Sequence, residues 1–267
     1  QNQSKCVSAH AHYTNVRLKI RSRNIQIVSQ ENMKWGFVGT ALWGVLIAAC
    51  IVVVQVVVVL AYSQATHGAI SEELIGKMAY NGTAISLATF ATLVICGLIT
   101  CGVIKLKKNS NLKEYLALNR VSKHQIKYWA LIVVGLIVLT DSLTLILGKP
   151  IVPEDMSTVY NSTSQPWLLI MALVIAAPVF EEIFFRGFLI SGFSSTFMGP
   201  IGAILVSALS WAAIHLQYDL YGMATIFVAG IVLGIARLKT NSILVPILMH
   251  SLMNIVATIE TAIYVSL

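Results

Sequence analysis

Long apolar stretches separated by short polar connections dominate this sequence. A bilayer is crossed by about 17 to 25 mostly apolar residues in helical conformation. Stretches of this kind cover residues 37–62, 82–104, 129–147, 167–190, 200–217, 221–236 and 242–264. We therefore predict an all-α, polytopic transmembrane bundle of about 7–8 helices.

Few residues remain outside these stretches, so we expect no separate soluble domain. Residues 1–36 are predicted to form a basic cytoplasmic tail. Residues 37–110 would contain two N-terminal transmembrane helices with a basic loop, and residues 110–267 the core of the protein.

Composition supports the same class of protein. Hydrophobic residues make up 57% of the chain and charged residues 11%, whereas a soluble domain is about one-quarter charged. The net charge of +7 does not indicate a nucleic-acid partner, because all but two of the 18 Lys and Arg residues fall on one side of the predicted membrane. By the positive-inside rule that side is cytoplasmic, which places the N-terminus inside.

The four cysteines show neither metal-ligand spacing nor the pattern of a disulfide framework. Cys50, Cys96 and Cys101 lie in predicted spans and Cys6 in the tail. We expect them to be small apolar fillers. The Gly230-x-x-x-Gly234 pattern predicts close helix packing.

One predicted span contains three charges, in the stretch AAPVFEEIFFRGFL. An ionisable side chain at the centre of a span costs about 2.5–3.5 kcal/mol on insertion scales. Glu182 and Arg186 are four residues apart and can neutralise each other on one helical face. Glu181 is rotated by about 100° from Glu182 and has no such partner, so the two glutamates should differ in role.

Two later spans also carry polar residues. His215 follows Trp211 by four residues, and Asn254 follows His250 by four, so each pair shares a helical face. Glu181, His215, His250 and Asn254 would then converge from three helices, where intramembrane polar groups normally meet one another or a water-filled cavity. Their depths match only if the SGFSSTFMGP turn projects into the cytosol, which predicts a cavity that opens to the cytoplasm.

These residue types can activate water against a peptide carbonyl. Glu181, buried among phenylalanines without a cation, suits a general base. Two versions remain open. In one, Glu181, His215 and His250 ligate a zinc ion. In the other, no metal takes part: Glu181 and His215 activate water, and His250 and Asn254 form an oxyanion hole.

The three motifs together resemble the CPBP family of intramembrane proteases, also called Abi or CAAX-protease-like proteins. They are Glu181-Glu182-x-x-x-Arg186, Trp211-x-x-x-His215 and His250-x-x-x-Asn254. The family's domain would cover about residues 110–265. The family usually has Phe where this chain has Trp211, a difference that concerns pocket shape.

The resemblance implies a role for each matched residue. Glu181 would be the catalytic carboxylate, Glu182 and Arg186 a supporting pair, and His215, His250 and Asn254 the remaining catalytic positions. The family is commonly labelled metalloprotease, although a metal-free glutamate mechanism has also been proposed for its prenyl-protein members.

We therefore expect a multi-pass intramembrane endopeptidase that acts near the cytoplasmic side of a prokaryotic plasma membrane. Its substrates would be prenylated CAAX-type C-termini, or bacteriocin or signal-type peptides held at the bilayer. The alternatives are a proton-coupled transporter, in which Glu181 and the histidines relay protons, and a non-catalytic bacteriocin self-immunity protein.

Overall fold

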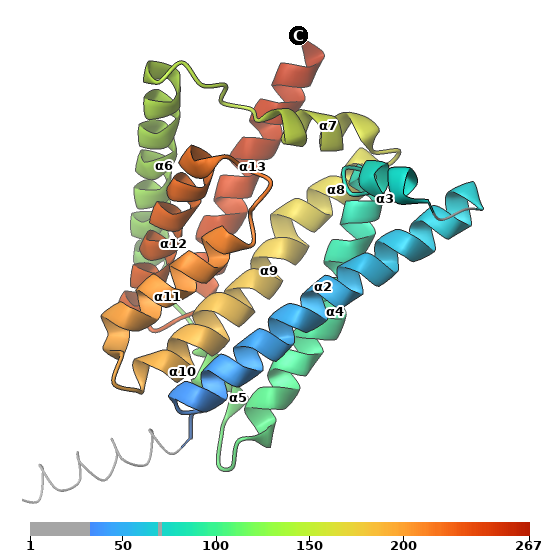
Figure 1. Ribbon diagram of the computed structural model, residues 1–267. Helices are drawn as coiled ribbons and strands as arrows, with labels where there is room; N and C mark the ends of the chain where they lie inside the picture. Colours follow the sequence, from blue (N-terminus) through green and yellow to red (C-terminus); the bar gives the residue numbers. More distant parts are fainter. Residues whose placement is uncertain (1–32, 69–70) are drawn as a thin grey trace, which may run out of the picture.

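A computed structural model describes residues 33–68 and 71–267 (Figure 1). Most of the predicted tail, residues 1–32, lies outside the described residues. The described part is mainly helical and contains no strand, which confirms the all-α class.

Within residues 33–68 and 71–267, six helical segments are long and apolar enough to cross a membrane. They are α2 (Phe37–His67), α4 (Gly82–Leu106), α6 (Lys123–Ile146), the continuous segment Pro166–Ser194, α12 (Leu220–Thr240) and α13 (Leu244–Ser266). Shorter helices join them: α3 (Glu72–Met78), α5 (Leu112–Leu116), α7 (Glu154–Ser162) and α11 (Gly199–Ala213). A multi-pass bundle is thus confirmed for this chain.

The predicted span over residues 200–217 is wrong. Helix α11 ends at Ala213 and has 15 residues, so it is only about 22 Å long, shorter than the roughly 30 Å bilayer core. The chain then turns, and the Asp219 side chain caps the start of α12 by accepting a hydrogen bond from the Gly222 amide (2.8 Å). His215 consequently lies in the connection between α11 and α12 and not in a span.

The helix from Pro166 to Ser194 changes its hydrogen-bond register twice. It consists of α8 (Pro166–Met171), the π-helix η1 (Ala172–Ala176), α9 (Ala177–Glu181), the π-helix η2 (Glu182–Leu189) and α10 (Ile190–Ser194). Short π segments in α-helices occur frequently at functional sites. Glu181 and Glu182 stand where α9 gives way to η2.

Basic residues gather where α2 begins, α4 ends and α12 ends, and we call this the basic end of the bundle. There, Lys107 lies over the Trp35 ring at 5.5 Å, and the Trp35 indole donates to the Val103 carbonyl (3.1 Å). The start of α2 lies beside α10, and the C-terminus lies at the far end of the bundle (Figure 1). The basic end is the side that the sequence predicts to be cytoplasmic.

Small residues bring α11 and α12 together. A Cβ placed on Gly230 would lie 3.0 Å from the Ala208 Cβ and 3.1 Å from the Trp211 ring, and one on Gly234 would lie 3.1 Å from Ile204. The close packing predicted from the GxxxG pattern is confirmed, and it presses Trp211 against α12.

Two of the cysteines meet between α2 and α4. The Cys50 and Cys96 sulfurs are 3.8 Å apart, close enough for rotation of the side chains to bring them into a disulfide. We expect an apolar oxidant to join them, giving a species two hydrogens lighter by intact mass spectrometry. Cys50→Ser should abolish the product, and Cys101→Ser should not; linkage through Cys101 would contradict the observed contact between Cys50 and Cys96.

Candidate active site

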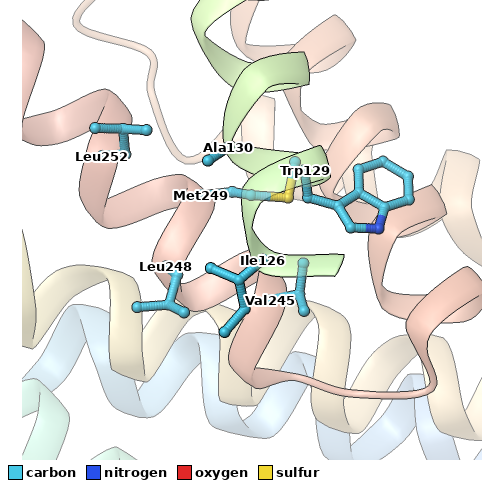
Figure 2. Close-up of a pocket in the computed structure, with 7 residues that line it drawn as sticks. All are labelled: Ile126, Trp129, Ala130, Val245, Leu248, Met249 and Leu252. Atoms are coloured by element: carbon cyan, nitrogen blue, oxygen red, sulfur yellow. The ribbon is translucent and has the colours of Figure 1, made fainter. Parts of the chain in front are cut away.

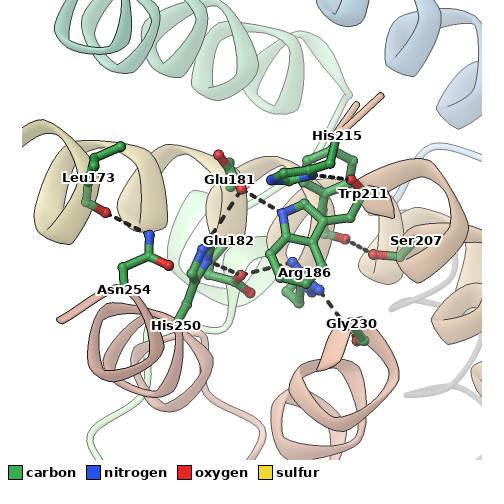
Figure 3. Close-up of polar contacts among 11 residues, drawn as sticks. Leu173, Glu181, Glu182, Arg186, Ser207, Trp211, His215, Gly230, His250 and Asn254 are labelled. Atoms are coloured by element: carbon green, nitrogen blue, oxygen red, sulfur yellow. Dashed lines mark hydrogen bonds and ion pairs between the residues drawn. The ribbon is translucent and has the colours of Figure 1, made fainter. Parts of the chain in front are cut away.

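A fully buried ion pair stands at the centre of the polar cluster. Glu182 and Arg186, both on η2, are 0% exposed, and Arg186 Nη1 donates to Glu182 Oε1 at 2.8 Å (Figure 3). The pair predicted from the spacing is therefore present. Arg186 also lies over the Trp211 ring at 4.4 Å, and its Nη2 donates to the Gly230 carbonyl on α12 (3.4 Å).

His250 on α13 bridges the two glutamates. Its Nδ1 is 3.0 Å from Glu182 Oε1, and its Nε2 is 4.0 Å from Glu181 Oε2. A carboxylate only accepts hydrogen bonds, so we assign the proton to Nδ1. Glu182 thus sets the tautomer of His250 and directs Nε2 towards Glu181.

Glu181 is the more accessible of the two carboxylates, with 17% of its side chain exposed against 0% for Glu182. The Trp211 Nε1–H donates to Glu181 Oε2 at 2.5 Å. Glu181 therefore has one oxygen held by an indole and faced by an imidazole.

Trp211 is more central to the site than its predicted place on the His215 face suggests. Besides Glu181 and Arg186, its ring contacts His250 at 5.1 Å and His215 at 5.5 Å between centroids, both edge-on. A buried indole N–H needs a hydrogen-bond acceptor. Because Trp211 lies on the same helical face as His215, this requirement could have predicted its hydrogen bond to the Glu181 carboxylate.

His215 lies next to Trp211, on the side of Glu181 (Figure 3). Its Nδ1 is bonded to the Trp211 carbonyl at 2.8 Å, and its ring stacks on Tyr218 at 6.2 Å. His215 is near the cluster but does not take part in the contact between the Glu181 carboxylate and the His250 imidazole.

Asn254 is held by the π-helix η1. Its Nδ2 donates to the Leu173 carbonyl at 2.7 Å. That carbonyl lacks a helical donor because the Ala177 amide bonds to Ala172 one residue further back, and Pro178 has no N–H. Asn254 therefore ties α13 to η1, and its role as an oxyanion donor stays a prediction.

Comparison with known proteins bears on this part of the chain. Residues 163–256 match the family described as type II CAAX prenyl endopeptidase, Rce1-like. This match supports the resemblance to the CAAX-protease-like family that the three motifs predict, and we call residues 163–256 the CAAX-protease-like segment. This segment runs from just before α8 into α13 and includes every residue of the three motifs.

An uncharacterized 24.3 kDa protein of Escherichia coli is 35% identical to this chain over 86 residues. The matched stretch covers 31% of this chain and 39% of that relative. No solved structure gives a significant match.

The CAAX-protease-like segment does not present the three predicted zinc ligands together. Among residues 33–68 and 71–267 no group of three His, Cys, Asp or Glu side chains could hold a metal ion. His215 Nδ1 is bonded within its own turn, and His250 Nδ1 is bonded to Glu182. As placed, these side chains do not fit a zinc ion, and the mechanism below takes no step through one.

A small apolar pocket borders the CAAX-protease-like segment where α6 meets α13 (Figure 2). Ile126 and Trp129 line it from α6, and Met249, the neighbour of His250, lines it from α13. None of the four predicted catalytic residues lines this pocket. The predicted cavity over the polar cluster, open to the cytoplasm, stays a prediction.

Proposed function

We propose that this protein is an intramembrane endopeptidase in which Glu181 activates a water molecule for attack on a peptide bond. One observation carries the proposal. A partly accessible carboxylate, held by Trp211, faces a buried imidazole that is itself fixed by a second carboxylate. Positioned acid and base groups of this kind can carry out the proton transfers that hydrolysis requires.

The residues supply each step of the reaction. Glu181 takes a proton from water while the water oxygen bonds to the carbonyl carbon of the substrate. The tetrahedral oxyanion is stabilised by a hydrogen bond from His250 Nε2 when that nitrogen carries a proton. The C–N bond then breaks, and Glu181 returns its proton to the leaving amine.

His215 and Asn254 remain proposed members of this site. Each is bonded to a backbone carbonyl here, His215 to that of Trp211 and Asn254 to that of Leu173. To act on substrate, each side chain exchanges this bond for one to the peptide. In structures without substrate, catalytic hydrogen bonds are often incomplete and form only when the substrate binds.

The proposed substrates are peptides held at the bilayer, either prenylated CAAX-type C-termini or bacteriocin or signal-type peptides. The family description supports the first class. The gathering of basic residues at one end of the bundle supports a cytoplasmic position for that end, with cleavage on that side.

A cleavage assay on the purified protein in lipid nanodiscs tests this function. We expect hydrolysis of a prenylated or membrane-bound unprenylated peptide, read by mass spectrometry, and no loss of rate with a zinc chelator. Proton flux in proteoliposomes without cleavage would favour a transporter instead. Loss of activity on chelation, restored by zinc, would contradict the metal-free mechanism.

A further inference from the structure

The Trp211 indole contacts one charged group with its edge and another with its face. Its N–H donates to Glu181 Oε2 (2.5 Å), and the Arg186 guanidinium lies 4.4 Å from the ring centroid. Trp211 is 2% exposed, and Gly230 lets α12 approach the ring closely. Because neighbouring groups enclose the ring, the direction of its N–H is fixed.

The cation on the ring face makes the indole a better donor. A guanidinium is attracted to the electron-rich face of an indole, and it draws electron density away from the ring nitrogen. The acceptor, an ionised carboxylate, also forms a stronger hydrogen bond than a neutral oxygen does. Arg186 therefore supports Glu181 through the indole, besides its own ion pair with Glu182.

The indole bond also bears on the distance between Glu181 and His250. His250 Nε2 lies 4.0 Å from Glu181 Oε2, which exceeds the roughly 2.7–3.2 Å of a hydrogen bond. When Nε2 carries a proton, an unrestrained carboxylate would pair with it. Such a pair could neither take a proton from water nor donate to an oxyanion. Trp211 opposes this pairing, because it holds the oxygen that faces His250.

The other oxygen of Glu181 is left for the reaction. Within residues 33–68 and 71–267, Glu181 Oε1 makes no hydrogen bond. The side chain is 17% exposed, so part of the carboxylate is accessible. Since Oε2 carries the indole bond, a proton taken from water would go to Oε1.

We propose that Trp211 is a positioning residue that holds Glu181 by Oε2, keeps it apart from His250 and leaves Oε1 to accept the proton of water. This inference rests on the proposed function. Phenylalanine, which the resembling family usually has here, carries no N–H. The arrangement is therefore a property of this chain and not of the family.

Replacement of Trp211 by benzothienylalanine tests the proposal, because sulfur takes the place of the ring nitrogen and only the N–H is lost. We expect kcat for peptide cleavage in nanodiscs to fall by about 10- to 100-fold, the value of a hydrogen bond to a charged group. KM should stay unchanged, because the bond acts on the base and not on substrate binding. An unchanged kcat, or a loss of kcat/KM that lies entirely in KM, would overturn the proposal.

Trp35 provides the matched control. Its indole N–H also donates to an acceptor, the Val103 carbonyl (3.1 Å), and a cation, Lys107, also lies over its ring (5.5 Å). Trp35 lies at the basic end and takes no part in the polar cluster. The same replacement at Trp35 should leave kcat unchanged. Equal losses of kcat at both positions, in step with lower melting temperatures, would indicate a purely structural role and would also overturn the proposal.

A spectroscopic measurement separates failure of this inference from failure of the proposed function. The indole ¹⁵N–¹H cross-peak of Trp211, identified by its absence from Trp211→Phe, should move upfield in Glu181→Ala, which lacks the acceptor. The Trp35 cross-peak should stay in place. This shift, without cleavage of any peptide by the wild type, would remove the protease function and support the hold on Glu181. A Trp211 cross-peak that does not move, beside normal cleavage by the wild type, would leave the protease function and remove the positioning role.

Discussion

Glu181→Gln should lower kcat by about 10²- to 10⁴-fold, the usual contribution of a general base. Glutamine has the same shape and can still accept the Trp211 indole hydrogen bond seen in the structure, but it cannot take a proton from water. The fold and peptide binding should therefore persist. Steady-state cleavage by purified variant and wild type, together with melting temperatures, measures the effect.

Glu260→Gln provides the matched control. Glu260 lies on α13, partly buried, and takes no part in the polar cluster described above. Its amide variant should cleave at the wild-type rate. Full activity in Glu181→Gln would exclude Glu181 as the base.

Arg186→Met should destabilise the protein by about 3–5 kcal/mol, because removing one partner of a buried pair leaves the other charge uncompensated. The reason is specific to this site: Glu182 is 0% exposed and its Oε2 has no hydrogen-bond partner in the described part of the chain. Thermal or SDS-induced unfolding in detergent, followed by near-UV circular dichroism, measures the loss.

The double variant Glu182→Leu/Arg186→Met separates stability from catalysis. Replacing both charges with apolar groups should restore most of the lost stability. Activity should stay low, because His250 Nδ1 loses the carboxylate that holds it (3.0 Å). A double variant as unstable as Arg186→Met would show that the pair contributes more than mutual neutralisation.

The transmembrane spans were predictable because the length of an apolar stretch is enough to indicate that it can cross a membrane. Five of the predicted stretches correspond to long helices with shifted ends, such as α2, which continues to His67, and a sixth to α12. The stretch 200–217 failed because hydropathy did not register the polar turn after Ala213, where Gln217 and Asp219 interrupt an apolar run.

The site was predictable where spacing on one helix decides the contact, as for Glu182 and Arg186. Contacts between helices were harder to predict. The convergence of Glu181 and His250 followed from the cost of burying polar groups, whereas the place of His215 depended on where α11 ends. The bond from Asn254 to the Leu173 carbonyl arises from a register change that periodicity does not reveal.

The π-helix η1 also changes the direction in which Glu181 points relative to the direction expected from residue counting along the sequence. A π segment behaves as one residue added to an α-helix, and each residue turns the helix by about 100°. A helical wheel drawn from Pro166 would therefore point Glu181 and Glu182 in the wrong direction. A homologue with one residue fewer between Met171 and Ala177 could continue as plain α-helix with its glutamates facing the same neighbours, so sequence alignments of this segment need their gap there.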